Sequence, residues 1–135
     1  MRIKKTAQER KGIQPVARMG ICEETGKAGK EEIAEMVQRK EVKAGDTVSF
    51  QVLAELPEGC GEVETMLWDF EGSDEFTPGG KITGTDGGRV RIENSHTFTR
   101  TGTHFPVVKV AVNRKPGDEF TRIYNQARVR VIVEE

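Results

Sequence analysis

The sequence predicts an all-β protein, an antiparallel sandwich of about seven short strands. Apolar residues recur with a period of two in several segments, and Gly, Pro, Asp and Asn punctuate the chain between those segments. Helical periodicity is scarce, so the alternating strands and helices of a parallel sheet are not indicated. The 135 residues are enough for one domain with its own hydrophobic core.

The start of the chain differs in character from the rest. Residues 1–12 are basic and lack apolar periodicity, so we expect a tail or linker followed by a sandwich domain of residues 13–135. Residues 15–21 predict the first strand, because a proline at the first position removes no hydrogen bond from a ladder.

A charged segment, residues 23–43, separates this strand from the next one. Within it Ile33, Met36 and Val37 recur at helical spacing, which predicts one short helical or irregular insertion. From there the period changes to two, and residues 48–54 predict a second strand after a turn.

A third strand is indicated by Met66, Trp68 and Phe70, which share one face at period two. Residues 71–88 are rich in Gly, Asp, Thr and Pro, and they predict a long loop with one short strand around residues 81–83.

The remaining strands are expected at residues 89–93, 95–99, 104–113 and 127–133. Gly102 lies in the turn that carries the chain from one expected sheet to the other.

Three motifs in this order carry a family resemblance. They are Gly45-Asp-Thr-Val-Ser-Phe50, then Trp68-Asp69-Phe70, then His96 to His104, which reads His-Thr-Phe-Thr-Arg-Thr-Gly-Thr-His. In order and spacing they resemble the polycystic-kidney-disease (PKD) repeat over residues 13–133, with its patterns G-x-x-V-x-F, W-D-F-G-D-G and H-x-Y/F-x-x-x-G-x-Y. The resemblance implies an immunoglobulin-like β-sandwich with Trp68 buried between its sheets.

The resemblance also implies a function. PKD repeats accompany secreted or surface hydrolases, so we expect a non-catalytic interaction or spacer module, the C-terminal accessory domain of a larger protein. Its expected partner is a protein or a neighbouring domain, with polysaccharide as a further partner, and its expected location is extracellular or at the cell surface. The basic start is not followed by an apolar stretch, so we expect no signal peptide in this chain.

The sequence departs from the family pattern at two places. Glu71-Gly72-Ser73-Asp74 stands where the family has Gly-Asp-Gly, so loop chemistry is not inherited from the family. His104 takes the place of an aromatic residue, which predicts a partly buried histidine.

Composition excludes several classes of partner. The 21 Lys and Arg residues are balanced by 22 Asp and Glu residues, giving a formal net charge of −1, so no basic field favours nucleic acid. No apolar run reaches the roughly 18 residues of a membrane-spanning helix, so membrane insertion is not expected. Cys22 and Cys60 are expected at opposite ends of the sandwich, too far apart for a disulfide.

Metal and cofactor chemistry is not favoured. An acidic loop could offer carboxylates to Ca²⁺, but counted from Asp69 its glycine falls fourth, whereas an EF-hand loop needs glycine sixth. His96 and His104 have no cysteine placed to complete a ligand set, so we interpret them as structural. No cofactor is expected. The acidic loop residues are Asp69, Glu71, Asp74 and Glu75.

Catalysis is also not expected, because the chain has no G-x-S-x-G motif and no serine beside an evident base. Two alternatives to the interaction module stay open. A carbohydrate-binding module would need an exposed aromatic platform, for which Tyr124 and a few phenylalanines remain. A small loop-based hydrolase would need Asp69, Glu71 and His96 to cluster in a pocket.

Period-two geometry predicts a docking face on one sheet. If Val108, Val110 and Val112 point inward, Phe105 and Val107 must point outward. Leu67 and Ile132 have the same outward parity, and their strands are expected in the same sheet. A contiguous apolar patch of this kind is seldom left uncovered on a soluble monomer. The expected docking residues are Leu67, Phe105, Val107 and Ile132.

Overall fold

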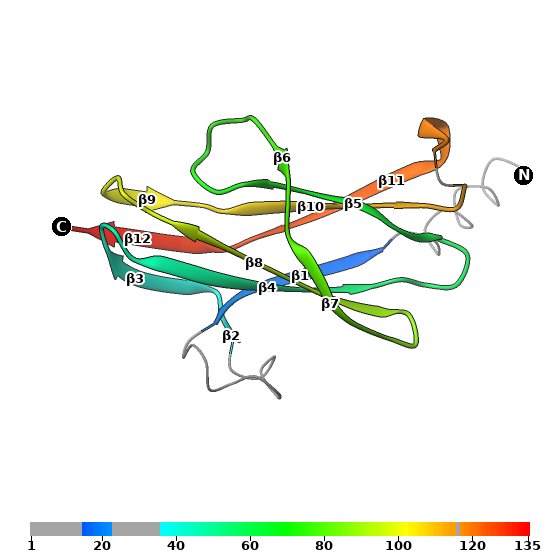
Figure 1. Ribbon diagram of the computed structural model, residues 1–135, viewed down its shortest axis with the longest axis horizontal. Helices are drawn as coiled ribbons and strands as arrows, with labels where there is room; N and C mark the ends of the chain where they lie inside the picture. The colour runs from blue at the N-terminus through cyan, green and yellow to red at the C-terminus, as the bar shows by residue number, and fades with distance from the viewer. Residues whose placement is uncertain (1–14, 23–35, 116) are drawn as a thin grey trace, which may run out of the picture.

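The computed structural model describes residues 15–22, 36–115 and 117–135, and it shows an all-β protein in which two layers of strands pack face to face (Figure 1). The predicted fold class is therefore confirmed. The expected basic tail at residues 1–12 lies outside the described residues, as does the greater part of the expected insertion.

The first layer is a five-stranded sheet with the order β2-β1-β4-β8-β7, and all its neighbouring strands are antiparallel. Its strands are β1 (Val16–Cys22), β2 (Met36–Val37), β4 (Thr47–Glu55), β7 (Lys81–Asp86) and β8 (Arg89–Thr97).

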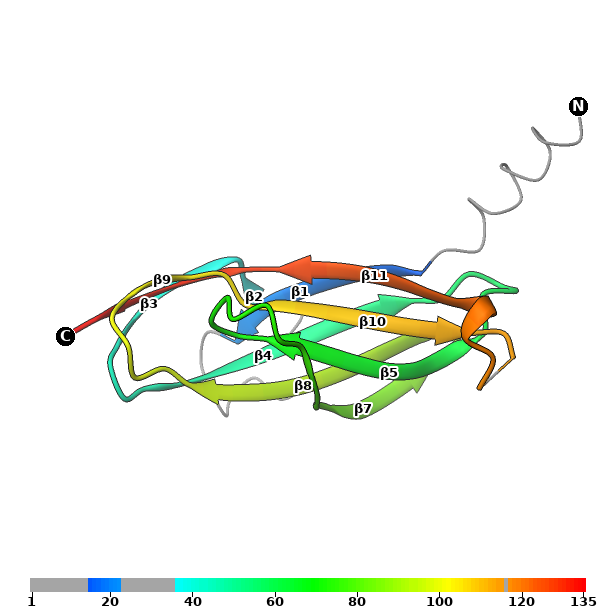
Figure 2. The ribbon, with the colours of Figure 1, turned by 90° about the horizontal axis from the view of Figure 1, so that it is seen from above.

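The second layer is a four-stranded antiparallel sheet with the order β11-β10-β5-β6, and Figure 2 looks down on it. Its strands are β5 (Glu62–Asp69), β6 (Thr77–Pro78), β10 (Val107–Asn113) and β11 (Arg122–Arg128). A 3₁₀ turn, η2 (Glu119–Thr121), precedes β11.

A small third sheet extends the sandwich at the C-terminal end, in the order β3-β12-β9. Here β12 runs antiparallel to β9 but parallel to β3, so the expectation of a wholly antiparallel sandwich is wrong at this pair. Its strands are β3 (Arg39–Lys43), β9 (Gly102–His104) and β12 (Arg130–Glu134).

The last expected strand, residues 127–133, is divided between two sheets. The division falls at Val129, whose N–H donates to the carbonyl of Pro106 at 3.1 Å instead of continuing either ladder. As a result β11 pairs with β10, whereas β12 pairs with β9 and β3.

The helical interpretation of Met36 and Val37 is wrong, because both residues form β2. They pair with Cys22 and Ile21 of β1. Met36 packs on Gly20, where an added Cβ would lie 2.5 Å from the Met36 Cβ. Pairing with β1 therefore overrides the local helical spacing. Ile33 lies outside the described residues.

The glycine-rich segment and the strand after it are more regular than predicted. The short strand expected at residues 81–83 extends to Asp86 as β7, and β6 precedes it. The two strands expected at residues 89–93 and 95–99 are one strand, β8, which ends at Thr97 and pairs with β4 from Arg89↔Glu55 to Thr97↔Thr47.

The core lies between the two layers and contains the inward residues of both. Trp68 is 1 % exposed, as predicted, and Val108, Val110 and Val112 are fully buried. Phe50 and Phe98 pack edge to face, with ring centroids 6.4 Å apart. Burial of aromatic and β-branched side chains on both inner faces is what holds two sheets together.

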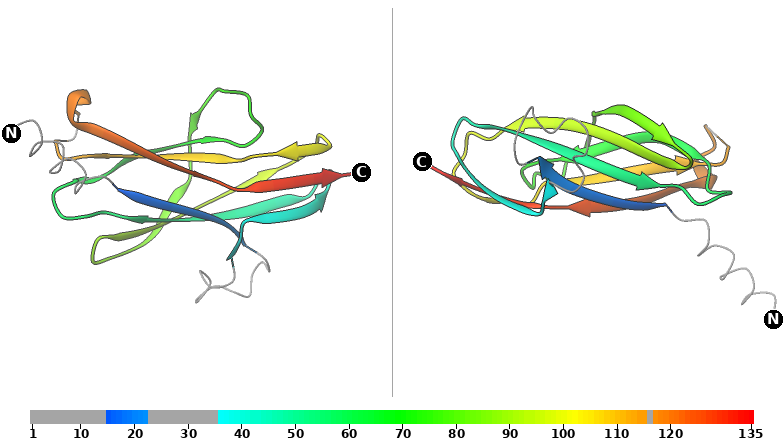
Figure 3. Two further views of the ribbon diagram at one scale, coloured as in Figure 1. Left: turned by 180° about the vertical axis from the view of Figure 1, so that it is seen from behind. Right: turned by 90° about the horizontal axis from the view of Figure 1, so that it is seen from below.

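One edge of the sandwich is closed by β1 and β11, which lie near each other in Figure 3 and contact through the Asn125 amide, a donor to the Pro15 carbonyl at 2.5 Å. In the part of the chain that the structure describes, no helix is long and apolar enough to span a membrane.

The two cysteines lie at opposite ends of β4, as predicted. Cys22 follows Ile21, which pairs with Phe50, whereas Cys60 lies beyond Glu55. Neither forms a disulfide.

Candidate functional site

The expected docking residues lie on one outer face, which continues from the second layer into the three-stranded sheet. Val107 and Leu67 occupy outward positions on β10 and β5, where Val107 pairs with Asp69 and Leu67 with Lys109. Both apolar side chains are half-buried. Their outward parity follows from full burial of the alternate residues on β10.

Ile132 also points outward, since Val131 and Val133 on either side of it are buried. It lies on β12, in the three-stranded sheet, and Leu67 lies in the four-stranded sheet. The expectation that both strands share one sheet is therefore wrong, because the chain changes sheet at Val129. The patch spans the junction of two sheets.

Phe105 is the most exposed of the four expected docking residues, with 44 % of its surface accessible. It lies between β9 and β10, and two cations from the facing strands cover its ring. The guanidinium carbon of Arg130 is 5.6 Å from the ring centroid and that of Arg128 is 5.9 Å away. Both distances are within the range of a cation–π contact.

A second cation–π contact lies on the same face, two residues beyond Val107 on β10. The Lys109 ammonium nitrogen is 4.1 Å from the centroid of the Phe76 ring. Lys109 pairs with Leu67 across the ladder. The face therefore alternates apolar side chains with cations that rest on aromatic rings.

Around Phe105 the charge on this face is positive, whereas beside Ile132 it is mixed, because Glu41 pairs with Ile132 and Glu134 follows two residues later. Arg128, Arg130 and Lys109 form no ion pair within the described residues. Asp69 is 6 % exposed, and both its carboxylate oxygens already accept hydrogen bonds. Glu134 continues the outward series of β12, four residues beyond Arg130 and so about 13 Å away.

The acidic loop is organised around Asp69. Its Oδ1 accepts from the N–H groups of Gly72 and Ser73 at 3.0 Å, and its Oδ2 accepts from the Asp74 N–H at 2.8 Å. Burial alone raises the pKa of Asp69, but these hydrogen bonds together outweigh burial and hold the pKa below its ordinary value. Asp69 therefore shapes the loop, as the sequence interpretation expected.

The four acidic loop residues do not converge. No group of three or more His, Cys, Asp or Glu side chains is placed to hold a metal ion in the described ranges. Asp74 has a positive φ of 67° and Gly72 one of 75°, and this turn directs their N–H groups to the Asp69 carboxylate.

Glu71 and His96 come together at the end of β8. The His96 Nε2 lies 2.6 Å from the Glu71 Oε2, and the Arg100 guanidinium lies 3.3 Å from the Glu71 Oε1. The hydrogen bond from His96 lowers the pKa of Glu71. Asp69 does not join them, because its oxygens face the loop backbone. The three-residue cluster that a hydrolase would need is not formed.

Both histidines are built into the aromatic packing. The His96 ring stacks on Phe70, with centroids 4.4 Å apart, and meets Phe98 edge to face at 4.7 Å. His104 is 8 % exposed, and its Nε2 is 2.9 Å from the Arg100 carbonyl oxygen. The predicted burial of His104 is confirmed, and these contacts support a structural role for both residues.

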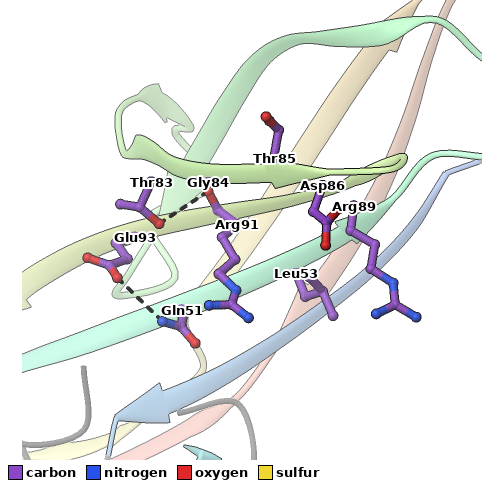
Figure 4. A pocket seen from close by; sticks show the side chains of 9 residues that line it. All are labelled: Gln51, Leu53, Thr83, Gly84, Thr85, Asp86, Arg89, Arg91 and Glu93. Atoms are coloured by element: carbon purple, nitrogen blue, oxygen red, sulfur yellow. Dashed lines mark hydrogen bonds between the residues drawn. The ribbon is translucent and has the colours of Figure 1, made fainter. Parts of the chain in front are cut away.

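The first layer has an open groove of about 410 Å³ on its outer face, between β4, β8 and β7 (Figure 4). Charges of both signs line it, from Arg89, Arg91, Glu93 and Asp86. The Gln51 side chain donates to the Glu93 carboxylate at 3.3 Å. Because the charges offset one another, this groove lacks the positive charge found around Phe105 on the opposite face.

Sequence reasoning missed the cations of the docking face. Arg128 and Arg130 alternate with buried valines, so their outward direction was readable from the period of two. No pattern in the sequence predicted the contact of Phe76 with Lys109, because Phe76 lies in an irregular loop.

The sheet order and packing define the class of this chain as an all-β sandwich, with an apolar and cationic face on its second layer. Comparison with protein-family models and with curated protein sequences found no match.

Proposed function

We propose that this chain is a non-catalytic interaction module of the PKD-repeat type. It is an accessory sandwich that docks a protein or a neighbouring domain through the outer face of its second layer and of the adjoining three-stranded sheet. The strand order supports the immunoglobulin-like part of the proposal. The order β1-β4-β8-β7 opposite β5-β10-β11 corresponds to strands A-B-E-D opposite C-F-G of an immunoglobulin-type sandwich.

The three sequence motifs occupy positions that also support it. Gly45, with φ of 98°, forms the turn before β4. Trp68 and Asp69 end β5, and the stretch from His96 to His104 connects β8 to β9 through Gly102, with φ of 127°. An extracellular or surface setting follows from the same resemblance and belongs to this proposal.

The observation that carries the docking role is the exposure of Phe105 on the same outer face as Val107, Leu67 and Ile132. An aromatic ring that is 44 % exposed, next to half-buried aliphatic side chains, is the composition of an interface centre rather than of a solvated face.

Protein is favoured over polysaccharide because the exposed rings do not form one platform. Tyr124 pairs with Ala111, and Phe105 lies opposite Arg130. The two rings are therefore separated by the six residues from Phe105 to Ala111. Six strand residues span about 20 Å, so the two rings cannot stack on neighbouring sugars.

The test is the double variant Phe105→Ser with Ile132→Ser, measured by calorimetric binding to the adjoining domain of the parent protein and by light scattering. We expect binding to weaken about tenfold or more while the fold, followed by circular dichroism, is kept. The matched control is Phe120→Ser, because Phe120 is 92 % exposed and lies off this face, on η2. Unchanged binding in the double variant contradicts the docking role.

A further inference from the structure

The docking face differs from an ordinary apolar patch because its cations lie over aromatic rings. Arg128 and Arg130 both rest on the Phe105 ring, and Lys109 rests on Phe76. Such contacts hold the charged groups over apolar surface. The cations are thereby pre-positioned beside the exposed ring.

These three charges remain available to a partner. Among the described residues, the acidic side chains that form ion pairs bind other cations. Glu41 pairs with Ile132 across the ladder, but its carboxylate binds Arg39. The other three are Glu55, Glu71 and Glu64, which bind Arg89, Arg100 and Arg122 in that order. The formal charge of the whole chain is −1, so the positive sign of this face is a local feature. The region around Phe105 and Phe76 carries cations of one sign, and such a region favours a partner of the opposite sign.

We propose that the outer face of the second layer binds an acidic peptide segment of the partner protein, with carboxylates at Arg128, Arg130 and Lys109 and apolar side chains on Phe105 and Val107. This inference rests on the proposed docking function and names the chemistry of its partner. Arginine guanidinium groups suit it, because they bind carboxylates through two parallel hydrogen bonds.

A peptide fits the pattern of this face better than other occupants. A second copy docked through the same face in a two-fold dimer would bring Arg128, Arg130 and Lys109 against their own kind, and like charges across an interface are unfavourable. A polyanion such as a sulfated glycan would meet the cations but leave Phe105 and Val107 uncovered. A segment that alternates acidic and apolar residues satisfies both sets of groups.

The test uses the full chain and a short fluorescent peptide in which glutamate alternates with leucine, with binding followed by anisotropy. The variant Arg128→Glu with Arg130→Glu should weaken binding about tenfold or more. The control Arg89→Glu with Arg114→Glu changes the net charge equally at two exposed arginines off this face, and its affinity should stay within about twofold of the wild type. A peptide alternating lysine with leucine should not bind, and added salt should weaken the glutamate peptide.

Several results overturn the inference. These are no binding of the glutamate peptide, equal loss in both reversal variants, or equally tight binding of the lysine peptide. Two others assign the face to another occupant: a sulfated glycan that binds as tightly and is indifferent to Phe105→Ser, or self-association of the wild type that the Arg128 and Arg130 reversal abolishes.

The two measurements distinguish failure of the docking function from failure of its acidic partner. If Phe105→Ser with Ile132→Ser loses the adjoining domain but no glutamate peptide binds, the docking face stands and its acidic partner is rejected. If neither measurement responds, both are rejected.

Discussion

The Trp68 indole N–H donates a 2.8 Å hydrogen bond to the carbonyl oxygen of Gly79, whose own N–H donates to the Met66 carbonyl at 3.2 Å. These two bonds attach the segment between β6 and β7 to strand β5. The segment passes from the second layer to the first, as Figure 1 shows, so Trp68 fills the core and also anchors the crossing between the sheets.

Trp68→Ala should be the most destabilising of the substitutions predicted here. It removes a side chain that is 1 % exposed, together with the hydrogen bond to Gly79. Large-to-small changes of this kind cost about 3–5 kcal/mol, comparable with the whole stability of a marginal domain. Chemical denaturation measures it, and near-wild-type unfolding free energy in this variant contradicts the core assignment.

Gly80→Ala should be destabilising although it adds only one methyl group. The added Cβ would lie 2.9 Å from the Trp68 Cζ2, and Gly80 has a φ of 90°. Backbone strain and the clash together should cost about 1–3 kcal/mol. Gly84→Ala is the matched control, because nothing lies within 4 Å of its added Cβ. Equal melting temperatures for the two variants would rule out this close approach.

The ionisation of Glu64 should make the free energy of unfolding depend on pH in the acidic range. Glu64 accepts a hydrogen bond from the Arg122 Nε at 2.6 Å and another from the Gly117 N–H at 2.9 Å. These bonds lower the Glu64 pKa from 4.5 to about 2. A carboxyl with a depressed folded pKa stabilises fully above its unfolded pKa and loses that contribution as pH falls from about 4.5 to about 2.

Glu64→Gln should therefore lower stability at neutral pH and flatten its decline between those two values. Glu62→Gln is the control, because Glu62 is an exposed carboxylate on the same strand. Thermal unfolding at a series of pH values measures both, and parallel pH profiles for wild type and Glu64→Gln argue against the network around Glu64.

The parts of the fold predicted from sequence are those set by local periodicity. Burial alternates at residues 47–50 of β4 and 107–110 of β10, as the period of two predicts, whereas the outward residues Gln51 and Leu53 of β4 are buried as well. The parallel pairing of β12 with β3 had no local signal, because it joins residues about ninety positions apart. Met36 and Val37 were misassigned because their helical spacing is short and pairing with β1 overrides it.

In the candidate site, too, the features set by local periodicity were predicted and those set by strand pairing were not. Outward direction at Leu67, Phe105, Val107 and Ile132 follows from the period of two. The cations over Phe105 depend on register between β12 and β9 and between β11 and β10, which the order of residues along one strand does not determine.

The two cysteines should behave as separate thiols. Cys22 lies beside the Phe50 end of β4 and Cys60 beyond Glu55, so at least five strand residues, or about 17 Å, separate them, against about 7 Å for a disulfide. Cys60 is fully buried, and burial raises its pKa. Thiol titration of unreduced monomer in denaturant should give two free thiols, with Cys60 reacting only on unfolding in the native protein. A titration without free thiols would contradict this placement.

Calcium should leave the stability unchanged, because the Asp69 carboxylate is already satisfied by the loop backbone. Asp69→Asn tests that explanation. An amide keeps one oxygen for Gly72 and Ser73 but turns its N–H₂ group toward the Asp74 N–H, leaving two donors facing each other. An unsatisfied buried group of this kind costs about 1–3 kcal/mol. Melting curves with and without millimolar Ca²⁺ should coincide in the wild type, and the Asp69→Asn curve should lie lower in both buffers. A Ca²⁺-dependent rise of several degrees in the wild type, absent from Asp69→Asn, would instead make this carboxylate an ion ligand, since a ligand that binds only the folded state raises its melting temperature.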